Sequence, residues 1–403
     1  MKYFSTFSGI GGFELGIQGA FETTQERLRQ ESEKPVRVGA TSWSDEGHEG
    51  LDGSTAVVLE HLIDSPAGQP HCVGYSEIDK YATKVYERHF PNHENYGDIT
   101  KINADELPDF DCLVGGFPCQ AFSIAGKRGG FDDTRGTLFF DLARILRAKQ
   151  PRLFVFENVK GLLNHDSGRT FATIVQTIDE LGYDCQWQVL NSKNHGVPQN
   201  RERVIIVGHL RGTPRPEVFP IGIADQVHTQ SNADKEEVHH VASTQTARQY
   251  ASWNGNFVGE INQLNQPKHS NDRVYGAEQG GNRQPFVQVP EATKKGYAEA
   301  TVGQSINLAQ PNSKTRRGRV SDIANTLDTQ QQQHTLTEDA QIRRLTPLEC
   351  ERLQAFPDNW TKYGKDGEEI SDTQRYKMCG NAVTTNVIRN VFERILAVEN
   401  SDI

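Results

Sequence analysis

The sequence predicts an α/β protein with a doubly wound sheet and a second, smaller, loop-rich domain. Up to about residue 210, short apolar runs alternate with segments whose apolar residues recur every three or four positions. Such alternation is typical of a parallel sheet covered by helices on both faces. From about 213 to 335 the chain is rich in Gln, Asn, Thr and Gly and has weak periodicity, which indicates short strands and loops, or disorder in parts.

Five apolar runs are rich in Val, Ile and Phe and flanked by turn residues, so we predict that they are buried strands. They are residues 3–8 (YFSTFS), 72–77 (CVGYSE), 111–116 (DCLVGG), 153–159 (LFVFENV) and 203–209 (RVIIVGH). The amphipathic segments 79–90, 136–148 and 170–182 between them are predicted helices. Helical periodicity returns at 345–356 and 381–398, and we expect the last helix to pack back on the first domain.

These changes divide the chain into a first domain over 1–212, a second domain and hinge over 213–372, and a C-terminal segment, 373–403, that returns to the first domain. An acidic insertion over about 22–71, with ten acidic and four basic residues, interrupts the first domain. We expect it to be a surface excursion.

Composition excludes several classes of protein. A chain of 403 residues with 35% hydrophobic and 24% charged residues is not disordered throughout. It also lacks any run of the roughly 18 apolar residues that a membrane helix needs. The N-terminus enters an apolar run without the basic start of a signal peptide, which indicates a cytoplasmic protein.

The net charge of −10 argues against a nucleic-acid substrate, but most of it lies in the insertion. A basic cluster, KTRRGR, contains Lys314, Arg316, Arg317 and Arg319. It is either a DNA-facing surface or a solvated loop.

The six cysteines are scattered without a CxxC pair, which argues against both a zinc site and a disulfide framework. We expect five of them to be small buried hydrophobes. These five are Cys72, Cys112, Cys185, Cys350 and Cys379.

A glycine-rich segment, FSGIGGFELG (7–16), joins the first strand to a helix through Gly9, Gly11 and Gly12. It could hold a dinucleotide or an adenosyl group, or it could be a tight turn only. The missing third glycine of GxGxxG weakens the dinucleotide interpretation. Glu77, after the second strand, can accept both hydroxyls of a ribose. Asp98 can accept from an adenine amino group, although either acid could instead cap a helix.

Cys119 follows the run 111–116, so the predicted sheet places it at the carboxyl edge, where doubly wound folds bind ligands. A thiol there is a candidate nucleophile if a neighbouring group stabilises its thiolate. The segment 120–137 that follows contains four glycines and is a candidate lid.

Glu157 and Asn158 end another apolar run. An acid there could donate a proton to a ring nitrogen or pair with a neighbouring arginine. Arg201 and Arg203 are two positions apart, so we predict that they share one face of a strand. Their expected partners are Glu157 and a substrate oxygen.

The order of these segments resembles that of the DNA (cytosine-5)-methyltransferases of bacteria and phages, which use S-adenosylmethionine. The segments are FSGIGGF, GYSEID, GDIT, GGFPCQ, ENVKGLL, QNRERV, RRLTPLECERLQAFPD and GNAV. The resemblance covers both ends and nearly all of the first 210 residues, and the middle region lies where that family has its variable target-recognition domain. It implies a Rossmann-like catalytic and cofactor-binding domain.

The resemblance also implies roles for the catalytic residues. Cys119 would add to carbon 6 of a flipped cytosine, and Glu157 would hold ring nitrogen 3. Arg203 would bind the oxygen at position 2, and Arg201 would help to hold the site. Carbon 5 is a poor nucleophile until such an addition makes it an enamine, and flipping the base costs about a few kcal/mol.

The family pattern further implies a substrate side and a cofactor pocket. The backbone at Phe117 and Pro118 would read the exocyclic amine of the base. The substrate side comprises Phe117, Pro118, Gln120, Asn158, Gln199, Lys314, Arg316, Arg317 and the pair Thr326 and Leu327. The pocket comprises Phe7, Gly9, Gly11 and Gly12 near the methionine moiety, Glu77 at the ribose, Asp98 and Ile99 at the adenine, and Asn381 and Val383.

Two features depart from the family pattern. The acidic insertion replaces a short connection. Ser5 stands where the family often has an acid or Leu, and Ile78 stands where it often has an aromatic side chain. We therefore expect modest cofactor affinity.

Three other hypotheses explain the sequence less completely. A tRNA cytosine methyltransferase would have a smaller recognition region, and a silent DNA-binding relative would not need Cys119, Glu157 and Arg203. A dinucleotide oxidoreductase would leave 118–120 and 199–203 without a role. The expected enzyme is a cytoplasmic monomer without metal that acts on double-stranded DNA. It would work in a restriction-modification pair, with the endonuclease as a genetic partner only, or as a phage or orphan enzyme.

Overall fold

The computed structural model describes residues 1–32, 69–118, 138–215, 217–222, 241–242, 286–308, 313, 315, 317–329, 333–337 and 342–399. Cys119, Gln120 and the predicted lid lie outside these residues, as do Lys314, Arg316 and most of the acidic insertion.

A seven-stranded sheet in the order β2-β1-β3-β4-β7-β5-β8 forms the centre of the first domain. Its strands are β1 (Lys2–Thr6), β2 (His71–Ser76), β3 (Cys112–Gly116), β4 (Leu153–Val159), β5 (Tyr183–Asn191), β7 (Glu202–Leu210) and β8 (Val241–Ala242). Strands β2, β1, β3 and β4 pair in parallel. This confirms the predicted doubly wound α/β class for that half of the sheet.

The expectation of a wholly parallel sheet is wrong, because β7 runs antiparallel to both β4 and β5. The connection from β5 to β7 contains only the short 3-10 helix η6 (Ser192–Asn194) and the two-residue strand β6 (Gln199–Asn200). A parallel crossover needs a dozen or more residues and usually a helix, so this short connection returns the chain in the opposite direction.

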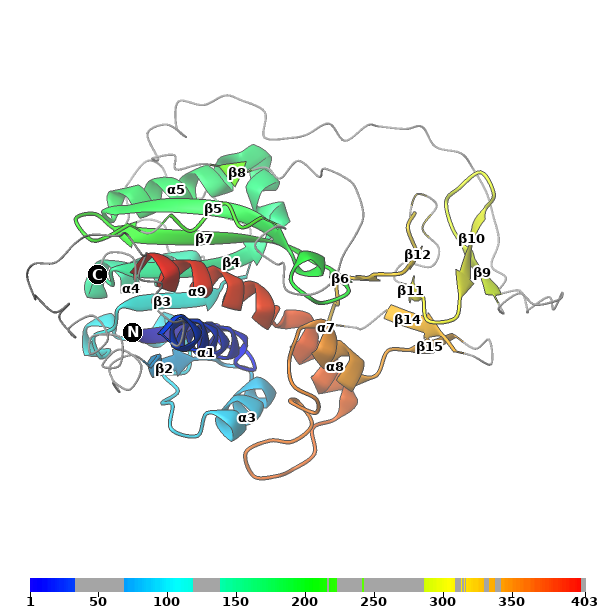
Figure 1. Ribbon diagram of the computed structural model, residues 1–403, viewed down its shortest axis with the longest axis horizontal. Helices are drawn as coiled ribbons and strands as arrows, with labels where there is room; N and C mark the ends of the chain where they lie inside the picture. Colours follow the sequence, from blue (N-terminus) through cyan, green and yellow to red (C-terminus); the bar gives the residue numbers. More distant parts are fainter. Residues whose placement is uncertain are drawn as a thin grey trace, which may run out of the picture.

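Helices cover both faces of the sheet (Figure 1). They are α1 (Gly12–Ser32), α3 (Lys80–His89), α4 (Leu138–Lys149), α5 (Arg169–Glu180) and α9 (Thr385–Glu399). Three short 3-10 helices connect them, η2 (Ile99–Lys101), η3 (Ala104–Glu106) and η5 (Lys160–Gly168). Side chains of β4 alternate between the faces, so Phe154 and Phe156 pack with α4 and α5, whereas Leu153 and Val155 pack with α1 and α9.

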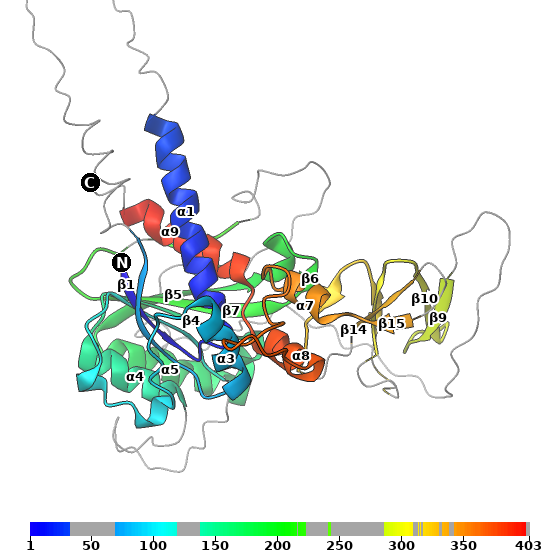
Figure 2. The ribbon, with the colours of Figure 1, turned by 90° about the horizontal axis from the view of Figure 1, so that it is seen from below.

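The C-terminal helix α9 packs back on the first domain, as predicted, and lies beside α1 (Figure 2). Val391, Phe392 and Ile395 are fully buried there, and each contributes about 1.5–3 kcal/mol by burial. Helix α1 continues to Ser32, so the start of the acidic segment that we assigned to an insertion is helical. Among the described residues, no helix is long and apolar enough to cross a membrane.

The second unit consists of short strands, at the right of Figure 1. They are β9 (Phe286–Pro290), β10 (Tyr297–Thr301), β11 (Ser305–Asn307), β12 (Val320–Ser321), β13 (Ala324–Asn325), β14 (Gln333–Leu336) and β15 (Ile342–Arg344). Strand β13 pairs in parallel with β6, which joins this unit to the carboxyl edge of the sheet. Two helices follow, α7 (Pro347–Leu353) and α8 (Asp372–Asn381).

Candidate active site

The ends of β3 and β4 lie side by side, because Gly116 pairs with Glu157 in the parallel register. A Cβ added at Gly116 would lie 3.1 Å from a carboxylate oxygen of Glu157, so a larger residue there would push against this carboxylate. Phe117 and Pro118 follow β3 directly, and Cys119 is the next residue in the chain. The segment that leads to the candidate nucleophile therefore starts beside Glu157.

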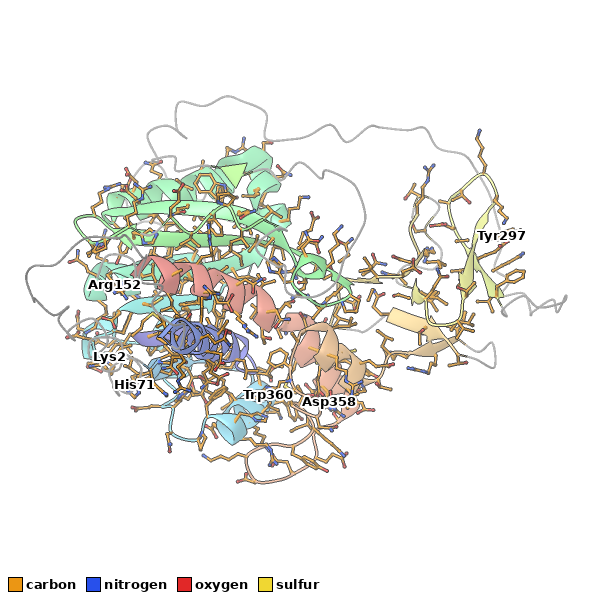
Figure 3. The ribbon with its side chains drawn as sticks, viewed as in Figure 1. Lys2, His71, Arg152, Tyr297, Asp358 and Trp360 are labelled. Carbon is orange, nitrogen blue, oxygen red and sulfur yellow. The ribbon has the colours of Figure 1, made fainter. Side chains whose placement is uncertain are left out.

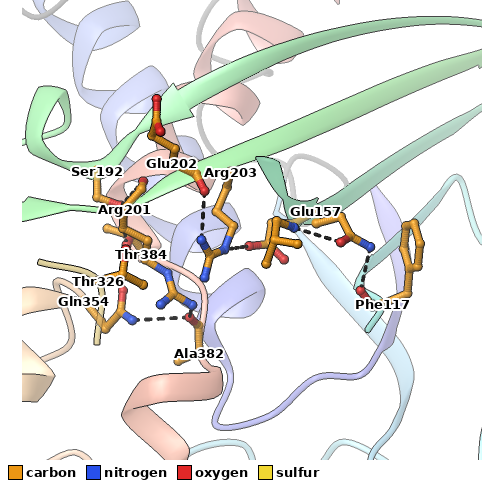
Figure 4. Close-up of polar contacts among 12 residues, drawn as sticks. Phe117, Glu157, Ser192, Arg201, Glu202, Arg203, Thr326, Gln354, Ala382 and Thr384 are labelled. Atoms are coloured by element: carbon orange, nitrogen blue, oxygen red, sulfur yellow. Dashed lines mark hydrogen bonds and ion pairs between the residues drawn. The ribbon is translucent and has the colours of Figure 1, made fainter. Parts of the chain in front are cut away.

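Glu157 forms an ion pair with Arg203, whose Nε lies 2.8 Å from the carboxylate (Figure 4). The two side chains are 11% and 16% exposed. The pair follows from the antiparallel register, in which Glu157 is opposite Ile205 and Val159 is opposite Arg203. Diagonal neighbours on one face of a sheet are within reach of long side chains. The expected pairing of Glu157 with one of the two arginines is thus confirmed, and the partner is Arg203.

Asn158, the residue after Glu157, holds the segment that follows β3. Its side-chain amide donates to the Phe117 carbonyl oxygen at 2.8 Å, and its own oxygen accepts from the backbone N–H of Val159 at 2.8 Å. Asn158 is 1% exposed, so breaking either bond would leave a buried polar group unpaired. Asn158 therefore sets the direction in which the backbone leaves β3 towards Cys119.

Arg201 does not share a face with Arg203, contrary to the prediction, because β7 begins only at Glu202. Its buried guanidinium donates instead to the carbonyl oxygens of Leu327, Gly380 and Ala382. Burial, with the nearby charge of Arg203, lowers the pKa of Arg201 to about 9, so the group is still charged at neutral pH. Arg201 holds together segments that are far apart in the sequence.

The glycine-rich segment makes the turn that was predicted between β1 and α1. Phe7, Gly9 and Gly11 have φ angles of 51°, 56° and 88°, in the left-handed region that favours glycine. A Cβ added at Gly9 would meet nothing within 4 Å, whereas one at Gly11 would lie 2.4 Å from the Phe90 ring. Open space therefore lies beside Gly9, and close packing lies on the other side of the turn.

Glu77 lies across from this turn at the end of β2. One of its oxygens accepts from the Gly9 N–H at 2.9 Å, and the other accepts from the N–H groups of Ile78 and Asp79 at 2.8 and 2.7 Å. The Ile78 side chain is 74% exposed. A positioned carboxylate next to an exposed apolar side chain suits a ribose and a flat purine base.

Asp98 and Ile99 lie further along the same edge. Asp98 accepts from the backbone N–H and hydroxyl of Thr100 at 3.0 and 2.7 Å and caps η2, which is the alternative role that the sequence left open. Ile99 is 3% exposed and packs in the core with α4. Its side chain therefore does not line an open pocket.

Val383 lies between the cofactor candidates and the catalytic pair. A Cβ added at Gly12 would lie 2.7 Å from the Val383 side chain, and one at Gly116 would lie 3.8 Å from it. Val383 also lines, with Glu157 and Arg203, a cavity of about 10 Å³. Asn381, two residues earlier, is exposed at the end of α8.

The Thr326–Leu327 pair lies at the junction of the two units. The Thr326 hydroxyl donates to the Asn200 carbonyl oxygen at 2.8 Å, and the Leu327 N–H donates to the Gln199 side chain at 3.0 Å. Gln199 is fully buried and also donates to the Leu353 carbonyl oxygen at 2.7 Å. Thr326 and Leu327 are therefore bonded directly to the carboxyl edge of the sheet.

The basic cluster is not a uniform surface patch. Arg317 is exposed and donates to the Ala292 carbonyl oxygen at 2.9 Å. Arg319 is 2% exposed and donates to the Asn307 carbonyl oxygen. Of the two, only Arg317 is placed where it could meet a phosphate.

Sequence reasoning missed two groups that support the site. Gln354 donates to the Cys379 carbonyl oxygen and accepts from the Thr384 hydroxyl. Trp360 lies against α3 (Figure 3), stacks on His89, and donates its indole N–H to the Ile10 carbonyl oxygen at 2.8 Å. The polar Gln354 inside the apolar run 353–356 was a signal for the first group.

The five cysteines expected to be core residues are all buried and form no disulfide with one another, which confirms that prediction. Burial raises the pKa of Cys72 and of Cys185 to about 12. These two therefore stay protonated thiols at neutral pH and are poor nucleophiles. Within the described part of the chain, no group of three or more His, Cys, Asp or Glu side chains is placed to hold a metal ion.

Comparison with known proteins gives the family. The model of the family described as C-5 cytosine-specific DNA methylase matches residues 65–397. Type II methyltransferase M.HpaII of Haemophilus parainfluenzae is 38% identical over 333 residues, which cover 81% of this chain and 83% of the relative. Orphan methyltransferase M.SPRI of Bacillus phage SPR is 31% identical over 403 residues, which cover 80% of this chain and 91% of the relative.

The fold agrees with that of solved structures. The crystal structure of S. pombe Dnmt2 methyltransferase aligns over 100% of both chains with a TM-score of 0.52 at 15% identity, which supports the fold alone. The family match extends over residues 65–397, which include the sheet from β2 onward and nearly all of helix α9. The chain belongs to the C-5 cytosine-specific DNA methylases, enzymes that methylate carbon 5 of cytosine in DNA.

Proposed function

We propose that the protein methylates a flipped cytosine within a specific double-stranded DNA sequence by covalent addition of Cys119 to carbon 6. The observation that carries this mechanism is the Glu157–Arg203 pair beside the segment that leads to Cys119. An acid and a guanidinium held together at this edge match the ring nitrogen and the carbonyl oxygen of cytosine. Methylation of an exocyclic amine, in contrast, would need no thiol nucleophile.

Cys119, Glu157 and Arg203 have successive roles in the reaction of the base. The Cys119 thiolate adds to carbon 6, and the electron pair that this displaces makes carbon 5 a nucleophile. Glu157, in its protonated form, donates a proton to ring nitrogen 3 and so relieves the developing negative charge. A guanidinium has five N–H groups, so Arg203 can hold Glu157 and also donate to the oxygen at position 2. Once carbon 5 has received the methyl group, its proton is lost to water. Elimination of the thiolate, with return of the nitrogen 3 proton to Glu157, then releases the product.

The residues around the glycine-rich turn fit S-adenosylmethionine, which the family uses and which supplies the methyl group when bound. Glu77 is already oriented by three backbone N–H groups, and a carboxylate oxygen has a further lone pair for a ribose hydroxyl. Ile78 offers an exposed apolar surface to the adenine. Open space at Gly9 leaves room for the methionine moiety. Val383 lies close to both Gly12 of the turn and Gly116 beside Glu157.

DNA is held, in this proposal, between the two units. Thr326 and Leu327 contribute to target recognition at the junction, and Arg317 contacts phosphates together with Lys314 and Arg316. The base enters the site by flipping, which costs about a few kcal/mol. The names of the relatives support a role in a restriction-modification pair or as a phage or orphan enzyme. We expect a cytoplasmic monomer, with any endonuclease a genetic partner only.

Analysis of the methylated product tests this proposal. Purified protein is incubated with labelled S-adenosylmethionine and unmethylated plasmid DNA, and the DNA is digested to nucleosides for mass spectrometry. We expect 5-methylcytosine, and we expect at least about a hundredfold loss of rate in Glu157→Gln, as for removal of a general acid. Label on an exocyclic amine, or label in tRNA but not in DNA, would contradict the proposal.

A further inference from the structure

Helix α8 contacts both the recognition segment, which we define as residues 326–328, and the cofactor side of the site. At its C-terminal end, a Cβ added at Gly380 would lie 2.5 Å from the Asp328 carbonyl oxygen. The backbones of α8 and the recognition segment are therefore in direct contact, and a displacement of one must move the other.

Arg201 holds α8 and the recognition segment together. It donates to the Ala382 carbonyl oxygen at 2.7 Å and to that of Gly380 at 3.2 Å, both at the end of α8. The last carbonyl groups of a helix lack partners within the helix, and the helix dipole favours a cation there. The same guanidinium donates to the Leu327 carbonyl oxygen at 3.3 Å. One charge thus stabilises the helix end and the recognition segment together.

The buried Arg201 depends on these carbonyl groups. Its Nε is buried and has no hydrogen-bond partner among the described residues, and the side chain is 2% exposed. A buried cation that loses a carbonyl partner is poorly solvated. Displacement of Leu327 is therefore unfavourable unless the end of α8 moves with it.

The cofactor side of α8 is fixed by a second cation. Lys377 Nζ lies 2.6 Å from the Asp79 carboxylate. Asp79 caps α3 and directly follows Glu77 and Ile78. Beyond the end of α8, Val383 packs against Gly12 of the glycine-rich turn. The helix thus reaches both walls of the proposed cofactor pocket.

We propose that α8 couples target binding to cofactor binding, with Arg201 and Lys377 as the positioning residues that attach it to the two sites. A recognition segment held by DNA holds the end of α8. The helix in turn holds Val383 and, through Asp79, the adjacent Glu77 and Ile78 in their binding positions. By linkage, the cofactor strengthens DNA binding by the same factor. This inference rests on the proposed function, because it takes residues 326–328 to meet DNA and the pocket to hold S-adenosylmethionine.

The coupling factor can be measured directly. Equilibrium dialysis gives the Kd of radiolabelled S-adenosylhomocysteine, the unreactive product, with and without saturating plasmid DNA. The ratio of the two Kd values is the coupling factor, and we expect it to be at least about five in the wild type. A loss of folded protein lowers the number of binding sites without changing this ratio, so the ratio distinguishes coupling from a merely structural role.

Three variants complete the experiment. Arg201→Met and Lys377→Met are expected to bring the ratio close to one. Lys84→Met is the matched control, because Lys84 forms a similar long-range ion pair, with Glu368, that does not involve α8; it should keep the wild-type ratio. If Arg201→Met does not fold, Lys377→Met decides, since that side chain is 45% exposed.

Two results would overturn the inference. A wild-type ratio of one, or an unchanged ratio in Lys377→Met, would refute coupling through α8 while leaving the proposed function intact. No binding of S-adenosylhomocysteine under either condition would refute the cofactor assignment and the inference with it.

Discussion

Glu14 provides a sharp test of the packing around the glycine-rich turn. It lies in the first turn of α1, is fully buried, and accepts a hydrogen bond from the Tyr86 hydroxyl at 3.0 Å. Its second oxygen is buried without a partner among the described residues. Burial raises the pKa of Glu14 from 4.5 to about 7.

This shift predicts how stability depends on pH. Between pH 4.5 and 7 the folded protein keeps a proton on Glu14 that the unfolded chain has lost, so folding becomes less favourable as pH rises. A shift of about 2.5 units corresponds to about 3 kcal/mol. The contribution of Glu14 is therefore fully favourable below pH 4.5 and is lost by about pH 7.

Glu14→Gln removes the ionisation and keeps an oxygen for Tyr86. We expect the variant to gain about 3 kcal/mol in free energy of unfolding relative to the wild type when the pH rises from 4.5 to 8. Urea unfolding followed by circular dichroism at several pH values measures this difference, and the comparison cancels the other titrating groups. A difference that does not change with pH would refute the reasoning.

Three further predictions concern the site. Trp360→Phe keeps an aromatic ring for His89 but loses the bond to Ile10, so KM for S-adenosylmethionine should rise about fivefold, with a change confined to kcat contradicting this. Asn158→Ala releases the Phe117 carbonyl and should lower kcat by about tenfold or more; single-turnover rates equal to the wild type would exclude that role. Brief iodoacetamide treatment should modify Cys119 first, as mass spectrometry of peptides will report, and faster labelling of a buried cysteine would contradict the assignment of the nucleophile.

The sequence predicted those elements whose apolar pattern is unbroken. Strands β1 to β4 and β7 and helices α3, α4 and α5 all lie where Val, Ile, Leu and Phe recur with the expected period. Strand β5 was missed because Gln186 and Gln188 occupy buried positions in it. Their side chains accept from the backbone N–H groups of Val218 and Ile221, and such long-range partners leave no local signal.

The site was predictable where its geometry follows from strand order and not where it depends on distant segments. Glu157 and Arg203 meet because they end neighbouring strands. Arg201 was misplaced because its partners, Leu327 and Ala382, lie far along the chain. Its proximity to Arg203 in the sequence suggested a shared role, but the strand begins between them.

The central claim is that Cys119 forms a covalent bond to cytosine during the reaction. The most direct measurement incubates the protein with S-adenosylmethionine and a mixed-sequence DNA duplex in which 5-fluorocytosine replaces cytosine, because fluorine at carbon 5 blocks the final elimination. Denaturing electrophoresis should then show a protein–DNA adduct in the wild type and none in Cys119→Ser. An enzyme that methylates unsubstituted DNA but yields no adduct, or a Cys119→Ser variant that still yields one, would contradict the account.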